Sequence, residues 1–426
     1  MKRGFLTTSK AQAKLSKDTN LRVSTAAKPE TIAVKKFLGV VENATVRPGG
    51  YETDSKERVM KERDALAPMG DLDEDAFLYT SQPSIGLKDT LQTYPDGWAE
   101  CVLYPDAKAL ILATPGFPAA LVRPSSRSYR VTSTPDKGLG LFSTRKISAG
   151  DLILSERPLT ISPAWTITRM RFLRELTEQE KYLAVVYEWE KTLQPMFDRL
   201  CPENKSAFMA LANSHQHDGS GPIVGRIRTN SFGLSCFQSG RFTAEEQRTM
   251  RKGVYSAVYN EISRLNHSCS PNVYGHFDIA TFSYQIFAVR DISKDEELTV
   301  SYTGLYSDSK ARQAELKSYG FQCTCPACRA PTESDMRRTI SSSLATNNLG
   351  DGLFKLSLLE EEGLQSIREY SETLEFVMER YIGVGDAANA IIYAKKLVKC
   401  RHSANDAKRY TTAIGVQSHS LWPKKS

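Results

Sequence analysis

The feature that most constrains this chain is a short irregular segment, Arg264-Leu-Asn-His-Ser-Cys-Ser-Pro-Asn272. Asn, Ser and Pro favour turns and local hydrogen bonds to the backbone, and they oppose a regular helix or a central strand. The backbone must therefore follow a specific path here. The same segment carries an Asn-His pair and a cysteine, which are side chains that contact ligands and metals. We expect it to hold a ligand and not only to pack.

Length and composition favour a mostly globular protein of two or three domains, with 426 residues, 40% of them hydrophobic and 25% charged. The net charge of +7 is spread along the chain. It is compatible with acidic, nucleic-acid or chromatin partners and indicates none of them alone. The longest apolar run, Ala107–Thr114, is far too short to cross a bilayer, so no membrane association is expected.

The first 75 residues are basic and polar, and they predict a largely disordered N-terminal extension. No continuous apolar stretch follows the first charges, which argues against a secretory signal. Basic and hydroxyl residues dominate as far as Lys36, so a mitochondrial presequence is the lesser alternative to a basic tail. Nucleus or cytoplasm is the expected compartment. Residues 76–125 are more apolar and rich in turns, and we expect an ordered extension that packs on the next domain.

Strand and helix patterns alternate through the middle of the chain. Short strand patterns at Tyr129–Thr132 and Asp151–Ser155 are separated by glycines. Helical spacing then runs from Arg171 to Glu190, with Thr177-x-x-Glu180 as a capping box. These patterns predict a β-rich domain that is interrupted by a helical insert at about 163–228.

The second half of the chain passes from strands to helices. A second capping-box pattern, Thr243-x-x-Glu246, predicts another helix start. Two runs rich in β-branched and aromatic residues, Phe282–Val289 and Glu297–Tyr302, are expected to pair with each other. Helical spacing returns from Glu333, as in Gly385–Val398, and predicts two to four packed helices.

Four segments occur in an order that resembles the SET-domain protein lysine methyltransferases, of the SMYD-like or fungal type. They span about 190 residues, and they are Lys137-Gly-Leu-Gly-Leu-Phe142, Asn266–Asn272, Glu296-Glu-Leu-Thr-Val-Ser-Tyr302 and Tyr319-Gly-Phe-Gln-Cys-Thr-Cys-Pro-Ala-Cys328. The resemblance implies an α+β fold of small sheets with a knot-like C-terminal threading. It divides the chain into a SET domain at 126–303, a post-SET zinc segment at 304–330 and a C-terminal helical region at 331–426.

Two glycines after the first strand form one part of the implied site for the methyl donor. Taken alone, Gly138 and Gly140 are typical of a hairpin turn. Without a Cβ they let the backbone approach a bulky ligand, and in the resembled family this loop contacts S-adenosylmethionine. Lys137 is then expected to face the carboxylate of the donor. Leu139 departs from the polar residue often found there in SMYD-like members, so we expect only backbone contacts from it.

The resemblance also assigns roles to five further side chains. An isolated Asn-His pair would be a polar turn with a satisfied imidazole, but the resemblance implies that Asn266 and His267 hold the amino-acid part of the donor, with His267 acting structurally. Asn230, in Thr229-Asn-Ser-Phe-Gly233, resembles an asparagine that contacts the donor, although a loop-to-strand turn explains it equally well. Tyr319 and Phe321 resemble, respectively, an aromatic of the lysine channel and the residue that stacks near the adenine.

Tyr302 resembles the catalytic tyrosine of the family, which also touches the methyl donor. The implied reaction is in-line attack of a neutral lysine amine on a sulfonium methyl group, so positioning and electrostatics matter more than a strong base. Free lysine has a pKa of about 10.4, so the site must favour the neutral amine. The Tyr302 hydroxyl is expected to orient the amine, and aromatic walls suit an alkylammonium stem.

Eight cysteines in a chain without an export signal favour reduced thiols, and three of them cluster at Cys323, Cys325 and Cys328. Tetrahedral Zn²⁺ needs a fourth soft ligand, which Cys269 can supply, and the post-SET cluster of the resembled family is built in this way. A Cys-His nucleophile pair at Cys269 is the alternative, but it has no obvious residue to orient the base. The other four cysteines have no such spacing.

The chain departs from SMYD-like proteins at two places. Residues 160–235 contain one cysteine, Cys201, so they predict no zinc-binding MYND finger. Asp295 stands where a glycine often begins the Gly-Glu-Glu-Leu turn, and aspartate tolerates the left-handed backbone conformation that this position requires.

The leading hypothesis is a protein-lysine N-methyltransferase that uses S-adenosylmethionine, acts on a histone or non-histone protein and carries structural zinc. The rival is a non-catalytic SET-fold interaction protein in transcriptional regulation. A third option, sequence-specific DNA binding, finds no helix-turn-helix signature, finger or basic stripe in its favour, and direct binding of this kind is not expected. Substrate choice is expected to depend on the insert and the C-terminal helices.

Overall fold

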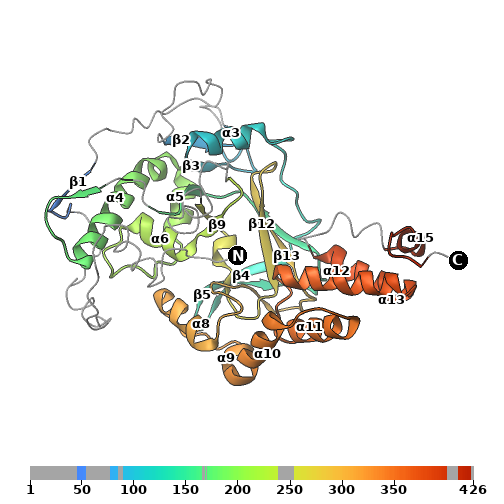
Figure 1. Ribbon diagram of the computed structural model, residues 1–426. Helices are drawn as coiled ribbons and strands as arrows, with labels where there is room; N and C mark the ends of the chain where they lie inside the picture. The colour runs from blue at the N-terminus through green and yellow to red at the C-terminus, as the bar shows by residue number, and fades with distance from the viewer. Residues whose placement is uncertain are drawn as a thin grey trace.

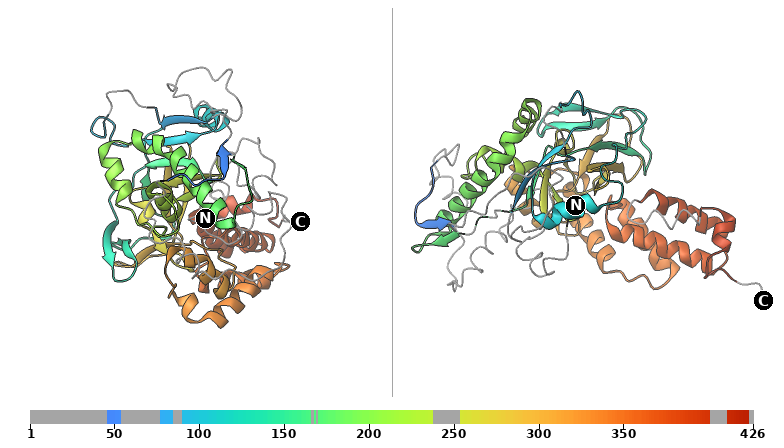
Figure 2. Two further views of the ribbon diagram at one scale, coloured as in Figure 1. Left: turned by 90° about the vertical axis from the view of Figure 1, so that its left-hand side faces the viewer. Right: turned by 90° about the horizontal axis from the view of Figure 1, so that it is seen from above.

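The computed structural model describes residues 46–53, 77–84, 90–165, 168, 170–237, 254–400 and 411–423. Most of the predicted N-terminal extension and the predicted helix start at Thr243 lie outside these ranges. Small sheets fill the middle of the molecule, helices of the insert flank them on one side, and the C-terminal helices form a separate lobe (Figures 1 and 2). The predicted α+β class is confirmed.

Four sheets are present in the described residues, and each is small. The five-stranded sheet has the order β2 (Leu78–Gln82), β3 (Ala99–Leu103), β7 (Thr160–Pro163), β10 (Tyr255–Val258) and β9 (Phe232–Leu234). The four-stranded sheet has the order β11 (Asn266–His267), β14 (Glu297–Val300), β5 (Gly138–Ser143) and β4 (Tyr129–Thr134). The three-stranded sheet has the order β12 (Val273–Asp278), β13 (Ser283–Ala288) and β6 (Leu152–Glu156), and the two-stranded one joins β1 (Tyr51–Thr53) to β8 (Met170–Phe172).

The two β-rich runs after the opening motif do not pair with each other, and that prediction is wrong. β13 lies in the three-stranded sheet, whereas β14 lies in the four-stranded one. The reason is that β12 and β6 already pair with both edges of β13, so β14 finds its partners in β5 and β11. The turn between the runs contains Asp295 with φ +66°, as the Gly-to-Asp departure predicts.

The helical insert consists of α4 (Glu178–Arg199), α5 (Pro202–Met209) and α6 (Pro222–Asn230). The predicted capping box starts α4, because Thr177 accepts a hydrogen bond from the Glu180 backbone and the Glu180 side chain accepts one from the Thr177 backbone. Buried faces of these helices form a hydrophobic cluster with β2, β3 and β10. The short helix α3 (Pro105–Ala113) follows β3.

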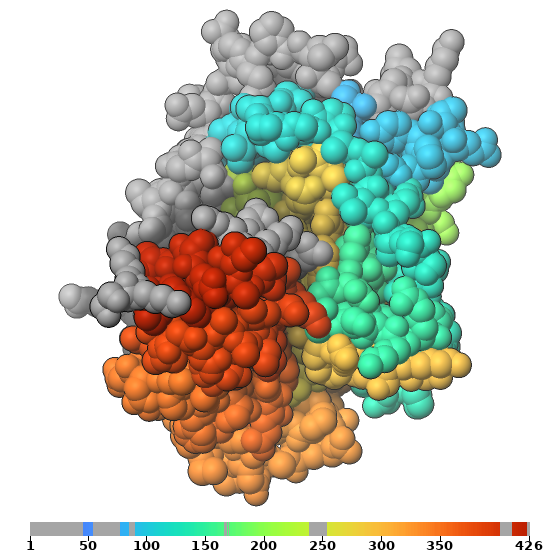
Figure 3. Space-filling view, turned by 90° about the vertical axis from the view of Figure 1, so that its right-hand side faces the viewer, coloured from blue at the N-terminus to red at the C-terminus, as the bar shows by residue number. Residues whose placement is uncertain are grey.

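Helices dominate after the sheets. α8 (Ser309–Leu316), the 3₁₀ turn η2 (Lys317–Tyr319) and α9 (Pro326–Arg329) surround the cysteine-rich segment. The C-terminal lobe contains α10 (Pro331–Ser343), α11 (Leu349–Glu361), α12 (Arg368–Gly383), α13 (Ala387–Lys399) and the short α15 (Ala413–Gln417). The lobe has its own hydrophobic core and lies beside the β-rich part (Figure 3). Within the described ranges, no helix is long and apolar enough to cross a membrane.

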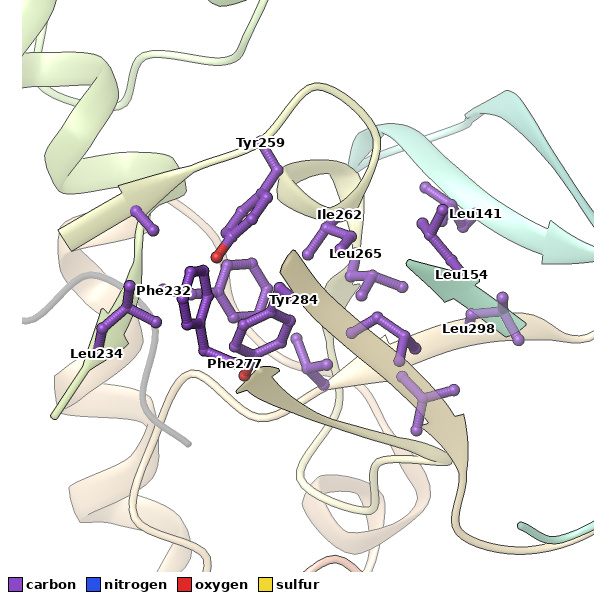
Figure 4. Close-up of a cluster of buried hydrophobic side chains, with 14 of the residues drawn as sticks. Leu141, Leu154, Phe232, Leu234, Tyr259, Ile262, Leu265, Phe277, Tyr284 and Leu298 are labelled. Carbon is purple, nitrogen blue, oxygen red and sulfur yellow. The ribbon is translucent and has the colours of Figure 1, made fainter. Parts of the chain in front are cut away.

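The main hydrophobic core positions the segment that opened the sequence. Phe232, Tyr259, Phe277 and Tyr284 gather on one side of this core and leucines of β5, β6 and β14 on the other, with Ile262 and Leu265 between them (Figure 4). Ile262 and Leu265 are fully buried. Leu265 immediately precedes the Asn-His pair, and Ile262 lies one turn earlier. The packed core therefore fixes the start of the loop.

Candidate active site and metal centre

A buried carboxylate anchors the chain just before the opening motif. The 3₁₀ turn η1 (Ile262–Arg264) begins there, and the Glu156 carboxylate accepts hydrogen bonds from the backbone N–H groups of Asn260 and Ile262 at 2.9 and 2.8 Å. Burial raises the pKa of Glu156 to about 7, although these backbone donors oppose the shift. The contact satisfies N–H groups that a helix start leaves without partners.

The Asn-His pair forms the short strand β11, which runs parallel to β14. Asn266 lies opposite Thr299, and His267 lies opposite Val300. This pairing turns the Asn266 side chain toward β5, where its amide nitrogen donates to Glu297 Oε1 at 2.8 Å and to the Leu139 carbonyl at 3.3 Å. The irregular loop and the glycine-bearing strand therefore meet through one side chain.

Glycine is required at two places in this meeting of strands. Gly138 has φ +73°, a left-handed conformation that side chains with a Cβ disfavour. A Cβ on Gly140 would lie 2.8 Å from the Asn266 amide nitrogen and 3.0 Å from Glu297 Oε1. Leu139, between them, keeps 43% of its surface exposed. The absence of a side chain at Gly140 lets the Asn266 amide approach the strand closely. The predicted approach of a ligand to this strand stays a prediction.

Charges of both signs border this meeting point. Lys137 Nζ and Glu297 Oε2 are 2.8 Å apart, and their side chains are 34% and 17% exposed. A ligand with an ammonium and a carboxylate finds one partner of opposite charge for each group here. The chemistry of this donor set fits the amino-acid end of S-adenosylmethionine, with the addition that Lys137 already has Glu297 as a partner.

Four aromatic rings, one of them the imidazole of His267, form a cluster. The ring of Tyr302 lies 5.3 Å from that of His267, 4.9 Å from that of Tyr319 and 6.4 Å from that of Phe321, measured between centroids. Gly320, with φ +78°, makes the left-handed turn that lets Tyr319 and Phe321 face the same cluster. The structure therefore brings three rings from 302–321 together with the imidazole of His267.

His267 is held as a neutral imidazole. Burial lowers its pKa to about 3. Its Nδ1 accepts the backbone N–H of Tyr302 at 2.9 Å, so the proton of the neutral ring resides on Nε2. Nε2 lies 3.3 Å from Cys269 Sγ and can donate to it. The imidazole thus links the Tyr302 backbone to Cys269, the first of the predicted metal ligands. His267 therefore positions these two residues.

The Tyr302 hydroxyl is buried and oriented. It donates to the Leu265 carbonyl at 2.7 Å, and the side chain is only 9% exposed. Because Leu265 precedes Asn266, the opening loop itself fixes the direction of the hydroxyl.

The four predicted metal ligands lie together. The sulfur atoms of Cys269, Cys323, Cys325 and Cys328 all lie within 4.8 Å of one another, and those of Cys269 and Cys328 are 3.6 Å apart. Tetrahedral zinc with bonds of about 2.3 Å to sulfur requires sulfur atoms about 3.8 Å apart. The donor set and its spacing fit Zn²⁺. In the described residues this is the one such group of His, Cys, Asp and Glu side chains.

The thiols of this cluster do not ionise independently. Hydrogen bonds from neighbouring thiols, Cys269 first, lower the pKa of Cys325, and they lower that of Cys328 to about 7. The hydrogen bond between Cys269 and Cys323 raises the pKa of the Cys269 thiol. Neighbouring thiolates repel one another unless a cation lies between them. A divalent metal is the ion that stabilises all four as thiolates.

Asn230 is the last residue of α6 and is buried. Its amide nitrogen donates to the carbonyls of Ala212 and Arg226, both in the insert. Its own carbonyl accepts a hydrogen bond from the Ser263 hydroxyl at 3.0 Å. The residue therefore ties the insert to the chain just before Asn266, and these contacts are structural.

Sequence reasoning missed three residues that organise the site. Glu297 contacts both Lys137 and Asn266. It belongs to the Glu296-Glu297 pair at the start of the third resembling segment, and this position could have marked it as a site residue. Arg338 donates to the Cys269 carbonyl at 2.9 Å, and Arg312 is buried beside the cysteines. Both arginines lie on helices after the motif, where no local sequence pattern marks them.

Comparison with known proteins relates part of the chain to one family. The family model described as SET domain matches residues 138–303. Histone-lysine N-methyltransferase set5 of Schizosaccharomyces pombe is 29% identical over 49% of this chain and 54% of its own length. The N-lysine methyltransferase SMYD2-A of Danio rerio is 32% identical over 24% of this chain and 23% of its own length.

A further relative, histone-lysine N-methyltransferase SET5 of Meyerozyma guilliermondii, is 34% identical over 24% of this chain and 23% of its own length. The chain thus spans about half the length of the first of these relatives and about a quarter of the other two. The family model extends from Gly138 to Thr303, which includes the opening loop and Tyr302.

Proposed function

The chain is a SET-domain protein related to the fungal SET5 and the SMYD proteins, and from this premise we propose that it is a protein-lysine N-methyltransferase that uses S-adenosylmethionine. The observation that carries the proposal is the oriented Tyr302 hydroxyl, bonded to the Leu265 carbonyl among three other rings. A hydroxyl fixed in this way beside a polar cradle is suited to orient an amine.

Two parts of the site have separate tasks in this proposal. S-adenosylmethionine supplies, when bound, a methyl group on a positively charged sulfur. Lys137 and Glu297 bind the carboxylate and ammonium of its amino-acid end, and Asn266 keeps the two strands in register. Gly138 and Gly140 keep the cradle free of side chains, Leu139 contributes only its backbone, and Phe321 offers a ring face for the adenine.

The aromatic side chains prepare the substrate. Tyr319 and Tyr302 line the approach of the lysine stem, and their rings exclude water from its amine. Loss of hydration disfavours the charged ammonium, so the fraction of neutral amine rises. The Tyr302 oxygen then accepts a hydrogen bond from that amine and directs its lone pair toward the methyl group.

Zinc has a structural task in the proposal. Cys323, Cys325 and Cys328 follow Tyr319 and Phe321 directly, and Cys269 follows His267. One ion bound by all four would fasten the aromatic segment against the opening loop. The approach path for lysine would then depend on the metal without any chemical step that involves it.

The proposed substrate is a lysine in a histone or non-histone protein. The relatives include histone-lysine methyltransferases and an N-lysine methyltransferase. The proposal therefore covers both histone and non-histone substrates. A nuclear or cytoplasmic site of action suits either class. The insert and the C-terminal lobe are proposed to select the substrate, and a scaffold without catalysis is the rival that an activity assay excludes.

We expect the purified protein to transfer radioactive methyl groups from labelled S-adenosylmethionine to lysines in core histones or in a nuclear and cytosolic extract. Tyr302→Phe should lower the transfer rate about 10²-fold, because one oriented hydrogen-bonding group at the reacting centre contributes about that much. Mass spectrometry of the labelled bands identifies the modified side chain. Transfer to arginine, or a rate unaffected by Tyr302→Phe, would contradict the proposal.

Tyr306→Phe is the matched control for this experiment. The Tyr306 hydroxyl is buried without a hydrogen-bond partner among the described residues, and its ring packs on the C-terminal core. Its removal should leave methyl transfer at the wild-type rate. A wild-type protein that binds no donor and transfers no methyl group supports the scaffold instead.

A further inference from the structure

Arg312, on α8, is a buried cation with unused donors. Its side chain is fully buried, and Nη1 donates to the Ser307 carbonyl and lies 3.1 Å from Asp335 Oδ1. Nε and Nη2 are buried and make no hydrogen bond of regular geometry to the described residues. An unpaired buried N–H group destabilises the folded state, and a charged one does so more strongly. A folded protein rarely leaves two such donors of one side chain without a purpose.

The neighbouring residue shows how α8 is fastened to the cysteine cluster. Gln313 Nε2 donates to the Cys323 carbonyl at 2.9 Å, and Gln313 Oε1 accepts the Cys323 backbone N–H at 3.1 Å. This pair of bonds fixes the helix against the metal loop at the position next to Arg312. The guanidinium is therefore held in place and does not reach the cluster by chance.

The thiols of Cys269 and Cys328 lie close to the Arg312 guanidinium. Burial opposes the charge of Arg312, but Cys269, Asp335 and Cys328 lie close enough to outweigh it, so the pKa of the guanidinium is raised. The opposite carboxylate, Asp335, is 25% exposed and occupies only Nη1. Asp335 therefore leaves Nε and Nη2 without a carboxylate partner.

A zinc ion with four thiolates leaves two negative charges in a buried place, and these charges need a partner. Arg338, the other arginine nearby, does not meet this need, because its guanidinium is already paired with the buried Glu362 carboxylate at 2.9 Å. It contacts the Cys269 carbonyl and not the sulfur. Arg312 is the cation whose donors are still available to the cluster within the described part of the chain.

We propose that Arg312 is a positioning residue of the metal centre, whose Nε–H and Nη2–H groups donate to the thiolates of Cys269 and Cys328 and hold the metal in place. The inference rests on the zinc site proposed above. Hydrogen bonds to thiolates lower the electron density on sulfur, so protons and electrophiles compete less well with the metal. Arg312 would thereby slow both metal loss and chemical attack on the cluster.

The test compares Arg312→Gln and Arg312→Lys with the wild-type full-length protein. Zinc release to a colour-forming chelator is followed at neutral pH, and thiol alkylation by iodoacetamide is followed in parallel. Arg312→Gln should lose zinc about 10- to 100-fold faster, the usual effect of removing an outer partner of a metal ligand. Arg312→Lys keeps the charge but not the fork of donors, so it should lie between the two.

Arg228→Gln is the matched control, because Arg228 is also a buried arginine with a carboxylate partner, Asp218 at 2.8 Å. It lies in the insert, away from the cysteines. Its removal should lower the unfolding temperature without changing zinc release below that temperature. If Arg312→Gln and Arg228→Gln release zinc equally fast at matched stability, the inference is overturned.

Cobalt(II) in place of zinc gives a readout that general loss of stability does not produce. Donors to sulfur stabilise its lone pairs, so their removal should shift the sulfur-to-cobalt charge-transfer absorption of Arg312→Gln to longer wavelength, with Arg312→Lys between it and the wild type. An unchanged spectrum and unchanged zinc release in a zinc-binding protein reject only this inference. A wild-type protein that binds neither metal rejects the metal site itself.

Discussion

Replacing Cys325 with serine is expected to reduce zinc in the purified protein from about one ion per chain to nearly none. A hydroxyl is a much weaker zinc ligand than a thiolate, and the three remaining sulfurs cannot complete the tetrahedron. Zinc binding contributes about 10–16 kcal/mol in small zinc-finger peptides. We therefore expect Cys325→Ser to affect metal content and stability more than any other single substitution proposed for this protein.

The structural consequence should be local at first. The cluster joins the chain at 323–328 to Cys269, and these cysteines pack on the main core. Without the ion, Tyr319 and Phe321 lose their fixed place beside Tyr302. Limited proteolysis should then cut the variant between α8 and α9 at protease concentrations that leave the wild type intact.

Metal content is measured by elemental mass spectrometry on protein purified under reducing conditions. Cys400→Ser is the matched control, because Cys400 is a half-buried free thiol outside the cluster, at the end of α13. It should keep its zinc. A Cys325→Ser protein that retains one tightly bound ion would show that the four cysteines do not form the site.

The second large effect is expected for Glu362→Ala, which should lower the free energy of unfolding by about 3–5 kcal/mol. Glu362 and Arg338 are 2% and 1% exposed, and the substitution leaves the guanidinium buried without its counter-charge. Arg338 also donates to the Leu305 and Cys269 carbonyls. The loss should therefore loosen both the C-terminal lobe and the metal loop.

Urea denaturation measures this effect, with fluorescence and zinc content as separate signals. The adjacent Glu361 is the control, because its side chain is 58% exposed and its partner Arg337 is 3.2 Å away. An exposed pair of this kind contributes about 0–1 kcal/mol, so Glu361→Ala should leave the unfolding midpoint nearly unchanged. Equal effects of the two substitutions would argue against a buried ionic tie.

The sequence predicted the elements whose signals are local. The capping box at Thr177 and Glu180 starts α4 as expected, and the apolar spacing before Lys399 corresponds to α13, with Asp386 as its N-cap. The convergence of the four cysteines was also predictable, because three cysteines within six residues restrict the chemistry strongly. The left-handed turn at Asp295 followed from the residue type that tolerates it.

Long-range pairing was not predictable in the same way. β13 and β14 are neighbours in sequence with a polar turn between them, which is the usual pattern of a hairpin. Their separation into two sheets depends on β6 and β5, which lie more than a hundred residues earlier. No local pattern carries that information.

The arginines near the metal loop were invisible for a similar reason. Arg312 and Arg338 occupy helical positions where an arginine normally faces solvent, yet both are almost completely buried. Only the packing of α8 and α10 against the cysteine loop reveals their contacts. The link from Lys137 through Glu297 to Asn266 likewise joins three separate segments.

One loop contributes to both the proposed donor site and the proposed metal site. Asn266 belongs to the cradle proposed for the methyl donor, whereas Cys269 belongs to the metal cluster, and His267 contacts both the Tyr302 backbone and the Cys269 sulfur. Asn266 and Cys269 are only three residues apart, so loss of the metal from the cysteines should change the position of Asn266 in the proposed donor site.

Calorimetric titration of S-adenosylmethionine into zinc-loaded and chelator-stripped protein tests this claim most directly. We expect the stripped protein to bind the donor at least about 10-fold more weakly, a coupling of about 1.4 kcal/mol that lies within the usual range between linked sites. Re-addition of zinc should restore the affinity. An equal affinity in the two forms, with the stripped form still folded by circular dichroism, would contradict the account.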